Sequence, residues 1–211
     1  MYAVVSPEKI QLPPGTVMRL PGTWNDYQAL AQQRGDKSIP RVKYRNGEIL
    51  LMSPLPVQGR DANILSDIVK VLLDYLERDY EAFTPVTIEL PEEGGIEPDY
   101  CFYIDNWQAA AGKDRINWQV DPPPDLVIEI DVTSFTAAED YAPYKVPEVW
   151  LLKKRALSLY TLKDDGSYEE CSNSQYFPGF NLHDLISRCV QTAYDRNTST
   201  AIRELRKSLR W

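Results

Sequence analysis

The sequence predicts an α/β fold in which helices flank a mixed β-sheet. Apolar residues recur at helical spacing over residues 61–77. Apolar runs within residues 125–131 and 146–152 are typical of buried strands. Two further helical patterns close the chain at residues 182–193 and 198–209. Helices that precede, separate and follow the strands favour a sheet covered by helices.

The N-terminal part is expected to hold an extended segment, a helix and a hairpin. Residues 1–22 are extended, with a turn at Pro13-Pro14-Gly15. Thr23 is a preferred N-cap residue for a helix over residues 24–34. Asn46-Gly47 is a strong hairpin signal. The strands of this hairpin are expected at residues 41–44 and 48–52.

The middle of the chain alternates between helical and extended patterns. After the amphipathic helix at residues 61–77, proline and glycine clusters mark the turns between strands. The expected elements are a strand at 83–90, a turn at 91–95, a strand following Glu97-Pro98-Asp99 up to residue 104, a short helix at 107–111 and a strand at 125–131.

The C-terminal part is expected to add strands to the sheet and then two helices. A short helix at residues 136–144 precedes the strand at 146–152. Asp164-Asp165-Gly166 is a turn between two further strands. These elements are expected at 156–162, 168–172, 182–193 and 198–209, the last within a C-terminal helical segment over residues 193–211. A length of 211 residues predicts a single domain over residues 1–211.

Composition excludes several classes of protein. The chain is 43% hydrophobic and 26% charged, as in ordinary globular proteins, and no apolar run is long enough to cross a bilayer. A cytoplasmic protein without membrane association is therefore expected. A single histidine excludes a zinc hydrolase with several histidine ligands, and three widely spaced cysteines indicate neither disulfides nor zinc. The net charge of −8 argues against broad, tight binding of nucleic acid.

Two pairs of acidic residues are the main functional signal. Glu97 and Asp99 lie two residues apart at one predicted strand, and Glu129 and Asp131 lie two residues apart at another. Residues at this spacing share a face of a strand. Buried carboxylates need compensation, and no basic residue is expected between the strand partners. Mg²⁺ or Mn²⁺, which prefer oxygen ligands, would provide it, so the pattern predicts a metal-dependent hydrolytic site.

A set of motifs in this order resembles the Uma2 family of endonucleases, which is abundant in cyanobacteria. The resemblance covers residues 22–192 and implies the restriction-endonuclease-like PD-(D/E)XK fold, with a mixed β-sheet core flanked by helices. The motifs are Trp24-x-x-Tyr27, Gly47-Glu48-x-x-x-Met52-Ser53-Pro54, Glu97-Pro98-Asp99, Pro124-Asp125-Leu126-Val127-Ile128-Glu129-Ile130 and Val146-Pro147-Glu148-Val149-Trp150.

The resemblance also implies residue roles. Asp99 matches the first metal-binding acid of the fold and Glu129 the acid on the neighbouring strand, while Glu97 is expected to lie outside the direct ligands. The lysine normally found two residues after the second acid is replaced by Asp131. Asp131 is therefore either a third metal ligand or a cap for the turn at Thr133-Ser134. The missing lysine is expected elsewhere, with Lys145 as the first candidate.

Two other lysines, Lys153 and Lys154, are further candidates for that position. An inactive site is the remaining possibility.

The leading functional hypothesis is a Mg²⁺- or Mn²⁺-dependent endonuclease that hydrolyses DNA phosphodiester bonds. The alternative is a catalytically impaired nucleic-acid-binding or assembly module that retains the nuclease fold. By analogy with single-domain members of this fold class, a homodimer is expected. The metal-site hypothesis also requires that the strands of Asp99 and Glu129 be neighbours, with both carboxylates opening on one cleft.

Overall fold

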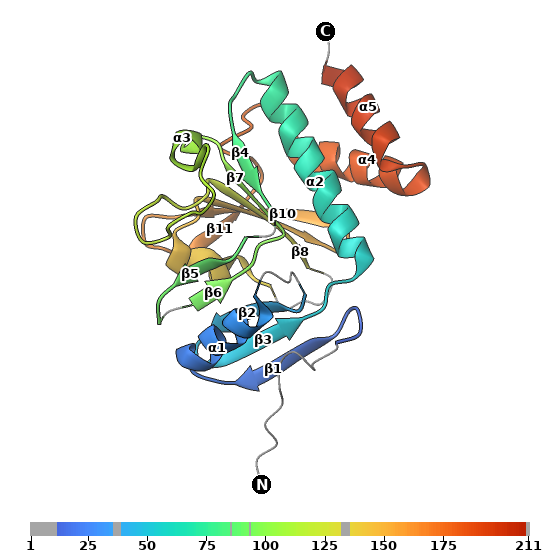
Figure 1. Ribbon diagram of the computed structural model, residues 1–211. Helices are drawn as coiled ribbons and strands as arrows, with labels where there is room; N and C mark the ends of the chain where they lie inside the picture. Colours follow the sequence, from blue (N-terminus) through green and yellow to red (C-terminus); the bar gives the residue numbers. More distant parts are fainter. Residues whose placement is uncertain (1–11, 36–38, 85, 93, 132–135, 210–211) are drawn as a thin grey trace. The chain divides into compact units, whose positions relative to one another are not determined.

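The computed structural model forms two compact units, each with its own β-sheet (Figure 1). The structure describes residues 12–35, 39–84, 86–92, 94–131 and 136–209. The first unit comprises Met1–Pro56 and Thr87–Glu97, and the second comprises Val57–Val86 and Pro98–Trp211. The α/β fold class is confirmed, whereas a single domain over residues 1–211 stays a prediction.

The first unit is an antiparallel sheet with one helix. The helix α1 (Trp24–Arg34) begins with a capping box between Thr23 and Asp26, as the N-cap prediction requires. Tyr27 is fully buried beside three aliphatic side chains of the sheet, so the helix packs on it through this ring. The strands, in spatial order, are β1 (Val17–Pro21), β3 (Glu48–Met52), β2 (Arg41–Arg45), β6 (Gly94–Ile96) and β5 (Ile88–Leu90).

The second unit contains the mixed sheet that the sequence predicts. Strands β8 (Leu126–Asp131) and β9 (Glu148–Lys153) are parallel, and the other described pairs of this sheet are antiparallel. The chain crosses from β8 to β9 through the 3₁₀ helix η2 (Ala138–Tyr144), which contains Pro143. The sheet order is β11 (Tyr168–Cys171), β10 (Ala156–Leu162), β9, β8, β7 (Tyr100–Tyr103) and β4 (Glu81–Phe83).

Helices cover one face of this sheet. The long helix α2 (Pro56–Tyr75) and the closing helices α4 (Leu182–Asp195) and α5 (Thr198–Leu209) share one apolar core with the strands (Figure 1). From β8, this core takes the alternate residues Leu126, Ile128 and Ile130. The residues between them in β8, including Glu129, therefore point to the opposite face.

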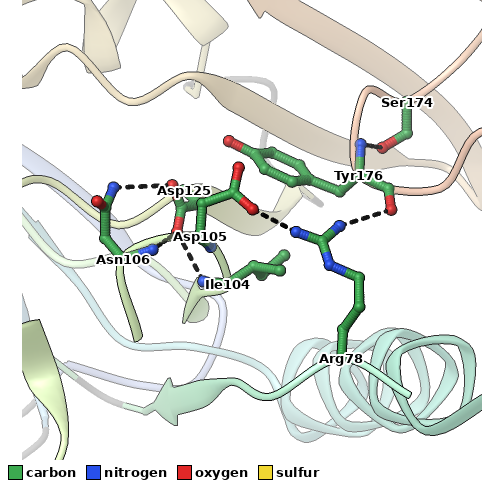
Figure 2. Close-up of polar contacts among 7 residues, drawn as sticks. All are labelled: Arg78, Ile104, Asp105, Asn106, Asp125, Ser174 and Tyr176. Atoms are coloured by element: carbon green, nitrogen blue, oxygen red, sulfur yellow. Dashed lines mark hydrogen bonds and ion pairs between the residues drawn. The ribbon is translucent and has the colours of Figure 1, made fainter. Parts of the chain in front are cut away.

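A carboxylate clamp closes the long loop between β7 and β8 (Figure 2). Asp125 accepts hydrogen bonds from the backbone amides of Ile104, Asp105 and Asn106, at 2.6, 2.9 and 3.1 Å. Arg78 pairs with Asp105 from outside the loop. The short helix α3 (Trp107–Ala110) lies within this loop, as predicted. Because the clamp joins the end of β7 to the start of β8, it holds these two strands in register.

Three predicted elements differ in the structure. The helix expected from residue 61 begins at Pro56, since proline is well tolerated in the first turn of a helix. The strand expected at residues 83–90 is two strands, β4 and β5, in different sheets. Its sequence includes Pro85, which has no amide hydrogen for a sheet. The turn expected at residues 91–95 is shorter, because Gly94 and Gly95 belong to β6.

The remaining helices and hairpins lie close to their expected positions. The predicted segments at residues 1–11 and 210–211 fall outside the described residues. Within the described ranges, no helix is both long enough and apolar enough to span a membrane.

Candidate active site

The predicted adjacency of the Asp99 and Glu129 strands is confirmed. Strands β7 and β8 are antiparallel neighbours, with Tyr100 paired to Ile128. Continuing this register by one residue places Asp99 opposite Glu129. Residues opposite each other in a sheet share a face, with Cβ atoms about 5 Å apart. The two acids are therefore neighbours on the face away from the helical core.

Asp99 is held by the backbone of the next strand. Its Oδ2 accepts a hydrogen bond from the amide nitrogen of Ile130 at 2.7 Å. The Ile130 carbonyl in turn accepts from the side chain of Gln58 in α2, at 3.2 Å. Side chains from outside β8 thus fix both backbone polar groups of Ile130. Gln58 was not identified from the sequence, because it precedes the predicted start of its helix.

Glu129 is held by a tyrosine of the crossover connection. The hydroxyl of Tyr141 in η2 donates to Glu129 Oε1 at 2.6 Å, and both side chains are buried. A hydrogen bond from a hydroxyl to a charged acceptor is short and strong. Tyr141 was also missed by the sequence analysis, and its only signal there is its position in the helix that follows the acidic strand.

Asp131 is paired with a lysine from the next strand. The parallel register of β8 and β9 places Lys153 opposite Asp131, and the lysine Nζ lies 3.4 Å from Asp131 Oδ2. The Asp131 side chain is 1% exposed and the Lys153 side chain 42% exposed. The expectation that no basic residue would stand between strand partners is wrong here. The cation is on the neighbouring strand, where sequence spacing does not reveal it.

Among the three candidate lysines, Lys153 is therefore the one that the structure pairs with Asp131. Lys145 is exposed and ends η2 with a left-handed backbone. Lys154 is exposed in the turn after β9. The turn at Thr133-Ser134, the alternative partner considered for Asp131, lies outside the described residues.

Glu97 belongs to the first unit and has a cation of its own. It forms an ion pair with Arg34 at the end of α1, and it accepts from the Val42 amide at 3.3 Å and the Thr87 hydroxyl at 3.0 Å. Its side chain is 4% exposed. Here too the expectation of an acid without a basic partner is wrong, and these contacts give Glu97 a structural role.

In the second unit, carboxylate side chains offer oxygen ligands that suit a hard cation. Mg²⁺ commonly takes one or two carboxylates and completes its shell with water, which fits Asp99 and Glu129 on opposed strand positions. Among the described residues, no three acidic, histidine or cysteine side chains are grouped so that they could hold one ion. Three direct ligands including Asp131 are therefore not assembled there, and the metal-binding roles stay predictions.

Comparison with solved structures shows the same fold. A crystal structure from Anabaena variabilis ATCC 29413, described as a putative nuclease belonging to DUF820, aligns with a TM-score of 0.50. The alignment has 16% sequence identity and covers 90% of this chain and 100% of the other. No curated protein sequence matches this chain.

Comparison of the sequence with models of protein families gives a match that covers most of the chain. The model described as "Uma2: Putative restriction endonuclease" matches residues 24–189, close to the range over which the motifs resemble that family. The match includes Asp99, which precedes β7, and the strands that carry Glu129 and Lys153. The chain therefore belongs to the Uma2 family.

Proposed function

We propose that this protein is a Mg²⁺- or Mn²⁺-dependent endonuclease that hydrolyses phosphodiester bonds of DNA. The observation that carries the proposal is the placement of two acidic side chains and one lysine side chain along three neighbouring strands. Asp99 precedes β7, Glu129 lies in β8, and Lys153 ends β9 beside Asp131. Two acids and a lysine on one sheet face are the chemical set that the nuclease fold requires. Here the lysine comes from a different strand.

The acids would hold the cation, and the structure shows how they are oriented. The Ile130 amide fixes Asp99, and the Tyr141 hydroxyl fixes Glu129. A bound Mg²⁺ or Mn²⁺ would supply charge stabilisation at the phosphoryl oxygens and a more acidic water. Preoriented ligands need no rearrangement when charge develops in the transition state.

Lys153 supplies the positive charge of the protein itself. Its Nζ is held at the end of β9 by Asp131, on the face that carries Asp99 and Glu129. A fixed ammonium group there can stabilise the negative charge that develops on a phosphoryl group under attack. Asp131 is then a positioning residue, which accounts for a second acid where the family pattern has lysine.

Cleavage of several nucleic acids in the presence and absence of metal tests the proposal. We expect cleavage of DNA with Mg²⁺ or Mn²⁺, none with EDTA, and loss of cleavage in Asp99→Asn and Glu129→Gln. Matched controls are Asp164→Asn and Glu170→Gln, because both acids are exposed near the β10–β11 hairpin turn. Cleavage that survives both site substitutions would refute the assignment.

The alternative, a module that retains the fold without the chemistry, is supported by one feature. The position two residues after Glu129, where the family pattern has lysine, is occupied by Asp131, so β8 itself supplies no lysine there. Binding of DNA without cleavage in any divalent metal would establish this alternative.

A further inference from the structure

The turn between β9 and β10 has an unusual composition for its geometry. Lys153 pairs with Ala156, so that Lys154 and Arg155 alone form the turn. Their φ angles are 50° and 67°. Two-residue turns with both residues left-handed favour Asn-Gly, because a side chain disfavours this backbone. Lysine and arginine at these positions oppose the local preference, and both side chains are exposed.

The second of these residues takes part in an ordered stack. The Arg155 guanidinium carbon lies 3.7 Å from the ring centroid of Tyr194 in α4, and that of Arg60 in α2 lies at the same distance. Two guanidinium groups this close to one ring must lie on its opposite faces. The Tyr194 hydroxyl donates to the buried carboxylate of Asp61, at 2.9 and 3.1 Å to its two oxygens. The stack is therefore fixed at its centre and exposed at its two arginines.

A stacked arginine can still bind a phosphate. Stacking uses the face of the guanidinium, whereas its N–H donors lie in the plane and point outward. Such a planar donor set matches two phosphate oxygens. Three exposed cations, Arg60, Lys154 and Arg155, thus gather near a single interacting carboxylate, Asp61, in a chain with a net charge of −8.

We propose that this basic turn cluster, defined as Arg60, Lys154 and Arg155, binds the phosphate backbone of the nucleic acid beside the cleavage site. The inference rests on the proposed nuclease function. Lys154 and Arg155 directly follow Lys153, so their Cα atoms lie within about 8 Å of the Cα atom of Lys153. The turn therefore places Lys154 and Arg155 at the end of β9 that carries the lysine of the proposed site.

One double variant removes the positive charge of the turn and at the same time gives the turn a sequence that suits its backbone geometry. Lys154→Asn with Arg155→Gly creates the Asn-Gly turn that this geometry favours, so the hairpin should form at least as well. It also removes two cations from the cluster. Arg60→Gln, made separately, removes the third and leaves the turn unchanged.

The measurement is the salt dependence of binding to a short fluorescein-labelled DNA duplex, followed by anisotropy in EDTA so that the duplex stays intact. Each phosphate contact contributes about 0.9 to the slope of log K against log salt. The double variant should therefore have a slope shallower by about 1.8. Between about 50 and 200 mM salt, the wild type should lose about 12-fold more affinity than the double variant.

A charge-matched control separates the cluster from net charge. Lys163→Asn with Lys207→Asn removes two exposed cations elsewhere in the same unit. Lys163 follows the far end of β10, about 20 Å from the turn, and Lys207 lies in the last turn of α5. This control should keep the wild-type slope. An equal reduction in the control would overturn the proposal.

The remaining outcomes are also decisive. A wild-type slope in the Asn-Gly variant overturns the proposal, whether or not the protein cleaves DNA. A lower melting temperature with that unchanged slope would mean that the stack serves only the fold. A shallower slope together with absence of cleavage by the wild type would support the cluster and refute the nuclease proposal.

Discussion

Lys153 is the side chain whose position changes the interpretation of this site. It lies 3.4 Å from a buried carboxylate while its own side chain is 42% exposed. An ammonium group in this position is oriented from within the protein and remains reachable from outside it. Among the described lysines that were considered, Lys145 and Lys154 have exposed side chains, but only Lys153 is the strand partner of Asp131.

The first prediction compares the lysines directly. Lys153→Gln should lower kcat for DNA cleavage by about 100-fold or more, as expected for loss of one group that stabilises transition-state charge. Lys145→Gln should leave kcat within about twofold of wild type. Steady-state cleavage at saturating DNA measures both. A loss caused by Lys145→Gln with full activity in Lys153→Gln would reverse the assignment.

The second prediction concerns Asp131. Asp131→Asn should lower kcat because an amide holds the Lys153 amine less firmly, and it should change Mn²⁺ affinity only slightly. Asp131→Lys should lower Mn²⁺ affinity more, because it adds a cation beside the acids. Calorimetric titration with Mn²⁺ measures these affinities, with Asp99→Asn as the variant expected to lose binding. Equal Mn²⁺ affinities for wild type and Asp131→Lys would show that Asp131 lies away from the ion.

At the scale of secondary-structure elements, β6 shows how a close contact determines which residue a strand can have at one position. Gly94 and Gly95 pair with the hairpin strand β2. A Cβ on Gly95 would lie 2.2 Å from the Tyr27 hydroxyl oxygen, which donates to Glu89 at 2.9 Å. The strand can therefore pass the tyrosine only where the side chain is absent.

The third prediction follows from this contact. Gly95→Ala should destabilise the protein by about 2 kcal/mol or more, because the buried tyrosine would have to move. Gly59→Ala is the matched control, since Gly59 lies in α2 and a Cβ there meets no atom within 4 Å. It should stabilise the protein by about 0.5–1 kcal/mol through helix propensity. Urea unfolding of both variants checks the opposite signs.

The fourth prediction uses Glu148, the buried acid at the start of β9. Burial raises the pKa of Glu148 above its ordinary 4.5, and hydrogen bonds from Ser174, Trp150 and Gln175 oppose this shift. The native state then holds this proton more tightly than the unfolded chain does. The contribution of Glu148 to stability is therefore complete below about pH 4.5 and is lost as the pH rises through the native pKa.

Comparison with Glu148→Gln isolates this effect. The unfolding free energy of the wild type, relative to that of the variant, should fall as the pH rises from about 4.5 to 7.5. Urea unfolding at several pH values measures it. A difference that stays constant over this range would show that Glu148 has the same proton affinity in both states.

Local patterns predicted most elements, and contacts between distant residues account for what they missed. The capping residue Thr23 and the turn Asn46-Gly47 act locally, so the helix and hairpin they mark were predicted correctly. Gly95 was assigned to a turn because its partner, Tyr27, is distant in sequence. Asp99 and Glu129, in contrast, were recognised because their motifs are local in the sequence. The pairing of Lys153 with Asp131 depends on a parallel register that local spacing does not encode.

At the scale of the whole molecule, the family match spans parts of both compact units. Residues 24–189 include α1 and the hairpin of the first unit as well as the acidic strands of the second. The family match therefore extends over both units, although the acids and lysine of the candidate site all come from the second.

The fifth prediction is that the protein is a homodimer, as two sites would allow both strands of a duplex to be cut. Sedimentation equilibrium over a wide concentration range should give twice the chain mass of 24.2 kDa. A constant monomer mass would contradict this expectation.

The parallel pairing of β8 with β9 also has a consequence for the newly synthesised protein. A chain that has emerged only as far as β8 carries the carboxylates but not yet Lys153, which follows the crossover through η2. Under the proposed function, cleavage requires Lys153, so chains in which this last strand has not docked should not cut DNA. During refolding from urea, cleavage should return no earlier than the burial of Trp150, which is fully enclosed in β9.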